Sequence, residues 1–172
     1  MSEKIEIMGI SVEKCYAEDI MESINQHWNE DTLATYGVIT MKLLIAAQKD
    51  EELKEYIETL DKAVADEPEI VKAAGLQDEA WESEISEHGF FGTLFWLLNL
   101  YKNRIFILGE KEEDTEKFCN YLREQYPDVV ILGKDSLTDM EADQTDRVIN
   151  EINSWNPQAV LSCSREYNVE RF

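Results

Sequence analysis

Basic residues are scarce in this chain, and their scarcity excludes partners that depend on positive charge. Of 172 residues, 16 are Lys or Arg and 37 are Asp or Glu, which gives a formal charge of −21 at pH 7. Nucleic acids and anionic lipids are bound by clustered cations that displace counterions from phosphates. No nucleic-acid partner is therefore expected. The acidity indicates a solvated exterior or, alternatively, an acidic docking face.

Cysteines and long apolar runs are also few. Cys15, Cys119 and Cys163 are odd in number and lack CxxC or His-paired spacing, which favours ordinary thiols in a reducing cytoplasm. No apolar run approaches the roughly 18 residues of a spanning helix, and the first residues lack the pattern of a secretory signal. We expect a cytoplasmic protein without a transmembrane segment, a cofactor or a metal.

Three short apolar runs in the C-terminal half predict buried parallel strands. They cover residues 104–109, 128–133 and 158–162, and little polar alternation interrupts them. Acidic, helix-like stretches separate the runs, so 103–165 is predicted to form a βαβαβ unit. Ligands of such sheets bind beyond the carboxyl ends of the strands, which directs attention to Gly109, Gly133 and the segment 162–164.

The N-terminal half predicts a similar alternation, and the whole chain is expected to form one α/β domain over 1–172. The predicted strands are 6–12, 35–41 and 62–65, and the predicted helices are 16–28, 50–59 and 69–74. The polar segment 77–88 is weakly periodic and is interpreted as a mobile loop or an irregular helix.

The segment Phe90 to Tyr101 is almost wholly apolar. It predicts a core helix that is shielded on most sides, with a membrane-surface or partner-binding helix as the alternative.

Several passages carry a family resemblance over nearly the whole chain. They are Glu6 to Val12, Gln48 to Leu53, Asn103 to Gly109, Tyr126 to Asp128, Ile149 to Asn153, and Asn156 with Pro157. With the order of the predicted elements, they resemble the WecG/TagA/CpsF family of bacterial glycosyltransferases. The resemblance implies a Rossmann-like three-layer fold with a mainly parallel sheet.

The resemblance also implies a function in the synthesis of cell-surface polymers. Members are understood to transfer an N-acetylhexosamine, often N-acetylmannosamine, from a UDP-sugar to an undecaprenyl-diphosphate-linked sugar. By resemblance, Asp66 is the catalytic base, Gly109, Gly133 and Ser164 border the substrate, and Arg165 lies near the diphosphate. The chemistry needs a base for the acceptor hydroxyl and donors for the leaving diphosphate.

The sequence departs from the family pattern at several of these positions. Glu67 and Glu110 replace glycines, Thr40 or Met41 replaces an asparagine, and the chain stops at Phe172 without the family's basic tail. Carboxylates near phosphate oxygens repel them, so weak UDP-sugar binding is predicted. Three hypotheses stay open. The chain is an active transferase, a catalytically silent homologue, or an unrelated nucleotide-binding α/β domain.

A silent homologue would associate with a related active subunit, or with itself, through the acidic face and the helix over 90–101. The partners considered are therefore a UDP-sugar and a protein subunit.

Individual residues also have simpler explanations. Asp66 would cap the helix that begins near Pro68, and His88 would be a loop histidine without a role. Arg165 would pair with Glu166 rather than with a phosphate. A further group of carboxylates would bind a divalent cation or, as we favour, form a solvated loop that caps the following helix; it comprises Asp135, Asp139, Glu141 and Asp143.

Overall fold

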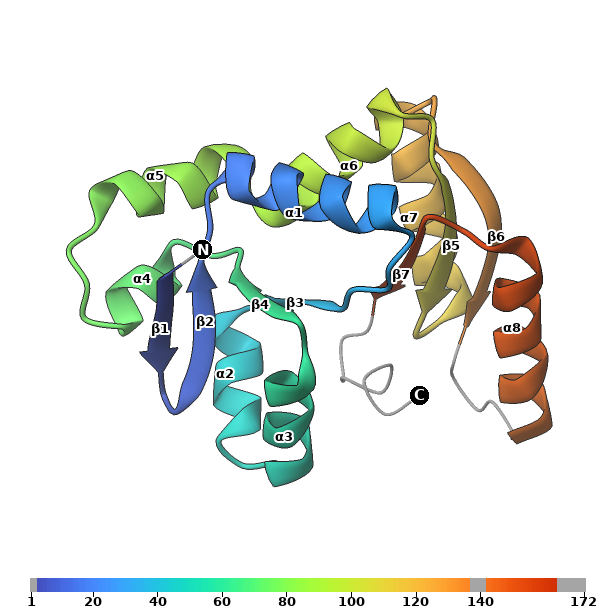
Figure 1. Ribbon diagram of the computed structural model, residues 1–172. Coiled ribbons are helices and arrows are strands. Elements are labelled where there is room, and N and C mark those ends of the chain that lie inside the picture. The colour runs from blue at the N-terminus through green and yellow to red at the C-terminus, as the bar shows by residue number, and fades with distance from the viewer. Residues whose placement is uncertain (1–2, 137–141, 164–172) are drawn as a thin grey trace. The chain divides into compact units, whose positions relative to one another are not determined.

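The computed structural model describes residues 3–136 and 142–163, and of residues 142 and 143 it describes only the backbone. The chain divides into two compact units, Met1–Leu94 and Phe95–Phe172. The described residues contain one sheet of four strands and another of three strands. Figure 1 labels the elements as they are named below. The α/β class is confirmed, and the expectation of one domain over 1–172 stays a prediction.

The N-terminal unit holds a four-stranded sheet in the order β1-β2-β4-β3. Its strands are β1 (Glu3–Ile7), β2 (Ile10–Lys14), β3 (Tyr36–Ile39) and β4 (Lys62–Ala65). β1 runs antiparallel to β2, whereas β2 and β3 each run parallel to β4. Because Ile39 pairs with Ala65, β3 and β4 end at the same edge of the sheet.

The single strand predicted over 6–12 is wrong, because this segment is a hairpin. Met8 and Gly9 both have positive φ values, 53° and 76°, and they form the turn between β1 and β2. Two-residue hairpin turns favour positive φ at both central residues because their twist then matches that of the strands. A methionine at the first of these positions gave no turn signal in the sequence.

Helices connect β2 to β3 and β3 to β4, and two further helices follow β4 (Figure 1). They are α1 (Ala17–Glu30), α2 (Met41–Ala47), α3 (Glu51–Thr59), α4 (Glu69–Ala73) and α5 (Glu79–His88). The helices predicted over 16–28, 50–59 and 69–74 are confirmed, with ends that shift by a few residues.

Helix α5 corrects the interpretation of 77–88 as a loop or an irregular helix. The Asp78 carboxylate accepts the backbone N–H of Trp81 at 3.1 Å, which satisfies one of the free donors at the start of the helix. Trp81 and Ile85 lie four residues apart and are both buried. Two apolar positions in a polar stretch give little periodicity, yet one of them is a fully buried tryptophan.

Helix α6 (Phe90–Leu100) is the apolar helix that the sequence predicts. Most of its large side chains are buried, among them Phe90, Leu94, Phe95, Leu97 and Leu98. The predicted core helix is therefore confirmed for the side of α6 that carries these buried residues.

The C-terminal unit holds three parallel strands in the order β6-β5-β7. They are β5 (Arg104–Gly109), β6 (Val130–Ser136) and β7 (Ala159–Cys163), joined by α7 (Glu112–Gln125) and α8 (Ala142–Trp155). The βαβαβ order is confirmed, although β6 begins at Val130 rather than at Asp128 as predicted.

The two faces of β5 pack against different helices. Phe106 and Leu108 form a cluster with Val148 and Ile152 of α8. Gly109 faces Thr115 of α7 on the opposite side of the pleat. Burial on both faces explains why β5 is apolar at successive positions.

Candidate active site

Asp66 lies at the carboxyl edge of the N-terminal sheet. It directly follows β4, and its backbone N–H donates to the carbonyl of Ile39, the last residue of β3, at 3.4 Å. The side chain is half-buried. Parallel strands commonly present functional groups at this edge, so the position of Asp66 suits a role in binding or catalysis.

The Asp66 carboxylate caps helix α6. Its Oδ1 accepts the backbone N–H of Phe90, the first residue of the helix, at 2.8 Å. This donor has no partner within the helix and needs one from outside. The prediction that Asp66 caps the helix near Pro68 is wrong, because the carboxylate caps α6 instead. Helix α4 has Pro68 at its N-cap and no side-chain cap hydrogen bond.

Gly89 makes room for this cap. It is the single residue between α5 and α6, and a Cβ atom there would lie 2.6 Å from Asp66 Oδ1 and 3.2 Å from the Ile85 carbonyl oxygen. Real Cβ atoms do not approach oxygens so closely, so any side chain at position 89 would displace the carboxylate or the helix. The glycine therefore allows Asp66 to reach the start of α6.

Burial raises the pKa of Asp66 above its ordinary value of 3.8. The hydrogen bond from the Phe90 backbone opposes this effect, and the neighbouring charge of Glu67 adds to it. An elevated pKa makes a carboxylate a stronger base than an exposed one, which suits proton abstraction from a hydroxyl group.

Glu67 turns toward helix α2, which follows β3. Its Oε2 accepts the backbone N–H of Met41 at 2.8 Å. Thr40 caps the same helix, since its Oγ1 accepts the N–H of Leu43 at 3.1 Å. Glu67 therefore ties the end of β4 to the helix after β3.

An aromatic pair supports the start of α6. The Tyr36 ring stacks on Phe90 with 5.5 Å between the ring centroids, and its hydroxyl lies 2.7 Å from Ser23 Oγ. Through Phe90, the helix that Asp66 caps is anchored on β3 and α1.

The two histidines both lie at helix C-terminal ends. His88 is exposed at the end of α5, and its backbone carbonyl accepts the Thr93 hydroxyl at 3.2 Å. His27 Nδ1 lies 2.9 Å from Thr32 Oγ1. A role for His88 stays untested.

Gly109 and Gly133 lie in the C-terminal unit, apart in the sequence from Asp66, and both are needed for packing. A Cβ at Gly109 would lie 1.7 Å from Thr115 Oγ1. A Cβ at Gly133 would lie 2.3 Å from the Trp155 ring and 2.8 Å from the Phe106 ring. Close packing accounts for both glycines, and their predicted place beside a substrate remains a prediction.

Several predicted site residues lie outside the described residues. Ser164, Arg165 and its possible partner Glu166 belong to this group, as do Asp139, Glu141 and the side chain of Asp143. Of the acidic group, Asp135 is described, and its Oδ2 accepts a hydrogen bond from Arg147 at 2.8 Å. Within 3–136 and 142–163, no group of His, Cys, Asp or Glu is arranged to hold a metal ion.

The cysteines are free thiols, as expected. Cys163, which ends β7, is the one that the sequence places nearest to the strand ends. Burial raises its pKa to about 11. The thiol therefore stays protonated at neutral pH and is a poor nucleophile.

The sequence did not reveal that Gly89 and Phe90 complete the surroundings of Asp66. One sequence feature could have pointed to a distant cap. A glycine directly precedes an apolar helix that has no Ser, Thr, Asp or Asn at its N-cap. Such a helix must obtain its cap from elsewhere in the fold. Sequence alone does not say which carboxylate supplies it.

Comparison with protein families places the chain in a family of glycosyl transferases. The chain belongs to the glycosyl transferase WecG/TagA/CpsF family, whose model matches residues 5–164. No curated protein matches the chain. Among the described residues, every helix is too short or too polar to cross a bilayer.

Proposed function

We propose that the chain transfers an N-acetylhexosamine from a UDP-sugar to a lipid-linked acceptor in the synthesis of cell-surface polysaccharides. One observation supports this most. A member of a glycosyl transferase family carries a half-buried carboxylate of raised pKa at the carboxyl ends of two parallel strands. In this proposal the fold is Rossmann-like with three layers, and the strand ends border the substrates.

The proposed reaction uses Asp66 as the general base. The carboxylate takes the proton of the acceptor hydroxyl, the acceptor oxygen bonds to C1 of the donor sugar, and the bond from C1 to the UDP oxygen breaks. UDP leaves with the electron pair of that bond. Gly109, Gly133 and Ser164 would border the donor, and Arg165 would offset the diphosphate charge.

Donor affinity is expected to be low. Glu67 and Glu110 stand where the family carries glycines, and like charges about 4 Å apart repel by about 1 kcal/mol in water and about 4 kcal/mol near a protein surface. Because the Glu67 carboxylate accepts a hydrogen bond from Met41, part of its charge is offset by the start of α2.

Thermal unfolding with a UDP-N-acetylhexosamine tests donor binding. At a ligand concentration five times Kd, we expect a stabilisation of about 1 kcal/mol, which raises the Tm by about 2–4 °C. Arg165→Ala should abolish the shift. Arg123→Ala is the matched control, because this exposed arginine pairs with Glu116 on α7. An unchanged Tm of the wild-type protein at millimolar ligand would count against donor binding.

The second candidate is a catalytically silent partner of an active family member. The observation that favours it is the cap on α6, since it gives Asp66 a structural reason to persist without catalysis. Co-purification with an active relative, together with absence of transfer by the isolated chain, would support this alternative.

A further inference from the structure

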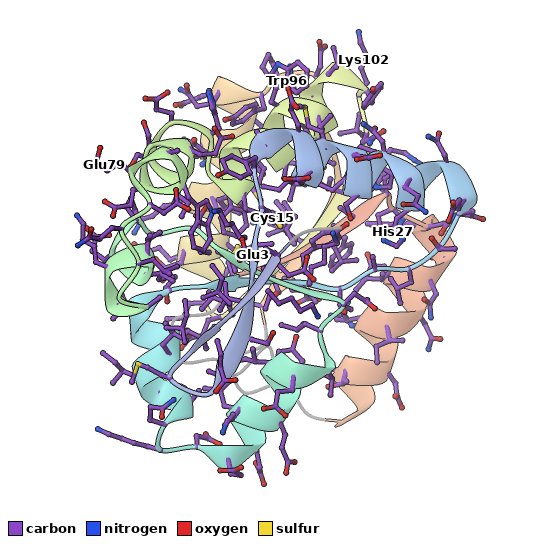
Figure 2. All side chains as sticks on the ribbon, turned by 60° about the vertical axis from the view of Figure 1, so that its left-hand side comes forward. Glu3, Cys15, His27, Glu79, Trp96 and Lys102 are labelled. Carbon is purple, nitrogen blue, oxygen red and sulfur yellow. The ribbon has the colours of Figure 1, made fainter. Side chains whose placement is uncertain are left out.

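Strand β1 forms an open edge of the N-terminal sheet. It is the first strand in the order β1-β2-β4-β3, so among the described residues only one of its two sides pairs with a strand. Of the described helices and strands, only β2 contacts it extensively. Figure 1 shows β1 at one end of this sheet, and Figure 2 brings that side forward, with Glu3 labelled at the start of the strand. An edge of this kind presents backbone N–H and C=O groups to another strand.

The hairpin turn decides which backbone groups of β1 point outward. Ile7 pairs with Ile10 across the two-residue turn, and such a closing pair exchanges two hydrogen bonds. Hydrogen-bonded and non-hydrogen-bonded pairs alternate along antiparallel strands. Ile5 therefore directs its N–H and C=O toward β2, whereas Lys4 and Glu6 direct theirs to the open edge. A further strand must align its own outward residues with Lys4 and Glu6.

The sequence of β1, Glu3-Lys4-Ile5-Glu6-Ile7, is complementary to itself when two copies run antiparallel. With Ile5 opposite Ile5 of a second copy, each Lys4 lies opposite a Glu6. The outward residues of both copies then exchange backbone hydrogen bonds, and both charged pairs join opposite signs. A shift of the register by two residues places Lys4 opposite Lys4 or Glu6 opposite Glu6. Charge therefore selects one alignment.

Strand β1 lacks most of the features that protect an edge from pairing. It contains no proline, and its pairing with β2 continues over five residues without a bulge. Its charged residues, Lys4 and Glu6, are exposed and suit a second copy. Lys4 lies 3.8 Å from Glu13 Oε1, and Lys62 lies 3.5 Å from Glu13 Oε2, so Glu13 keeps a cation when Lys4 turns toward a second copy. Strand β3, the opposite edge of the sheet, has no charged side chain.

We propose that two copies of the chain associate through β1, as antiparallel edge strands related by a two-fold axis at Ile5. The two N-terminal sheets then form one continuous sheet. A two-fold axis brings the same surface of both copies together, which a self-complementary strand satisfies. A pair of short strands buries less surface than a permanent dimer does, so the dimer is weak and reversible. The association goes beyond the proposed transfer and does not depend on it.

Sedimentation equilibrium at about 0.15 M salt, where long-range repulsion between the acidic chains is largely screened, tests the association. We expect a monomer–dimer equilibrium with a Kd of about 0.1–1 mM. Glu6→Lys should weaken it at least about tenfold, because both cross-strand pairs then join two lysines. Glu124→Lys is the matched control, since Glu124 is exposed on α7 and the net charge changes equally. Unspecific association would instead be strengthened by both variants, because each lowers the negative charge.

Cross-linking tests the alignment without a change at Lys4 or Glu6. In this alignment the two copies of Ile5 form a non-hydrogen-bonded pair with Cα atoms about 4.5 Å apart, within the range of a disulfide. Ile5→Cys should therefore form covalent dimers under mild oxidation. Glu3→Cys is the control, because the two copies of residue 3 would lie about 14 Å apart along the strands. The Glu3 side chain is 72% exposed, so random collisions would favour this control variant.

Preferential cross-linking of Ile5→Cys, together with weaker association of Glu6→Lys, would support the pairing. A wild-type chain that stays monomeric at about 1 mM would overturn the proposal. Cross-linking of Glu3→Cys at least as fast as that of Ile5→Cys would also overturn it. Dimers that persist unchanged in Glu6→Lys would assign the association to another surface and contradict the proposal equally.

Discussion

Replacing Gly109 by alanine should lower the free energy of unfolding by about 1–3 kcal/mol, as expected for overpacking at a tight contact. The added Cβ would lie 1.7 Å from Thr115 Oγ1 and 2.9 Å from Thr115 Cβ. Thr115 is buried, and its hydroxyl donates to the Lys111 carbonyl at 2.8 Å, so it has little freedom to move aside. Either α7 or the end of β5 must shift. Denaturant unfolding at constant m-value measures the loss.

Gly92→Ala is the control for this variant, and it should raise the free energy of unfolding rather than lower it. A Cβ at Gly92 would meet nothing within 4 Å, and the residue lies inside α6. Alanine in a helix is more stable than glycine by roughly 0.5–1 kcal/mol. Equal stability of the Gly109 variant and the wild-type protein would show that α7 does not pack on β5 as described.

Asp66→Ala should cost about 1–2 kcal/mol of stability, because the Phe90 N–H at the start of α6 loses its acceptor. Asp66→Asn should cost less, since an amide oxygen can accept the same hydrogen bond without the charge. Chemical denaturation of the two variants separates the contribution of the capping hydrogen bond to stability from that of the carboxylate charge. If alanine and asparagine were equally stable, the cap would have no energetic role.

Comparison of the wild-type protein with Asp66→Asn tests the raised pKa of Asp66. A carboxyl whose folded pKa lies above 3.8 holds its proton more tightly in the folded state than in the unfolded state. Between 3.8 and the raised pKa, stability must fall as the pH rises, and above this window it is constant. The wild-type protein should therefore lose stability relative to Asp66→Asn as the pH rises from about 4.

The regular parts of the fold could be predicted because their residues follow simple periods. Strand β4 has the predicted bounds, and β5 has a run of apolar residues that suits burial on both faces. The hairpin at Met8 was missed, and the regular helix at Trp81 was predicted only as a loop or an irregular helix. A turn without Asn and a helix with two buried side chains leave weak local signals. Both are decided by packing rather than by propensity.

The candidate site could be predicted only in part. The family resemblance led to Asp66, and the structure places that residue at the end of a parallel strand beside β3. Its contact with Phe90 joins residues 24 positions apart in sequence, which no local pattern reveals. The resemblance indicated departures at Glu67 and at Thr40 or Met41. The shared role of Glu67 and Thr40 at the start of α2 depends on the three-dimensional fold.

Transfer of labelled N-acetylhexosamine from a UDP-sugar to a lipid-linked acceptor, compared between the wild-type protein and Asp66→Asn, decides whether this carboxylate acts as a base. Loss of a general base lowers rates by about 10²–10⁴-fold. We expect transfer by the wild-type protein and at least a 100-fold loss in a variant that unfolds at nearly the same denaturant concentration. Equal rates, or no transfer by the wild-type protein beside an active relative, would contradict the proposed mechanism.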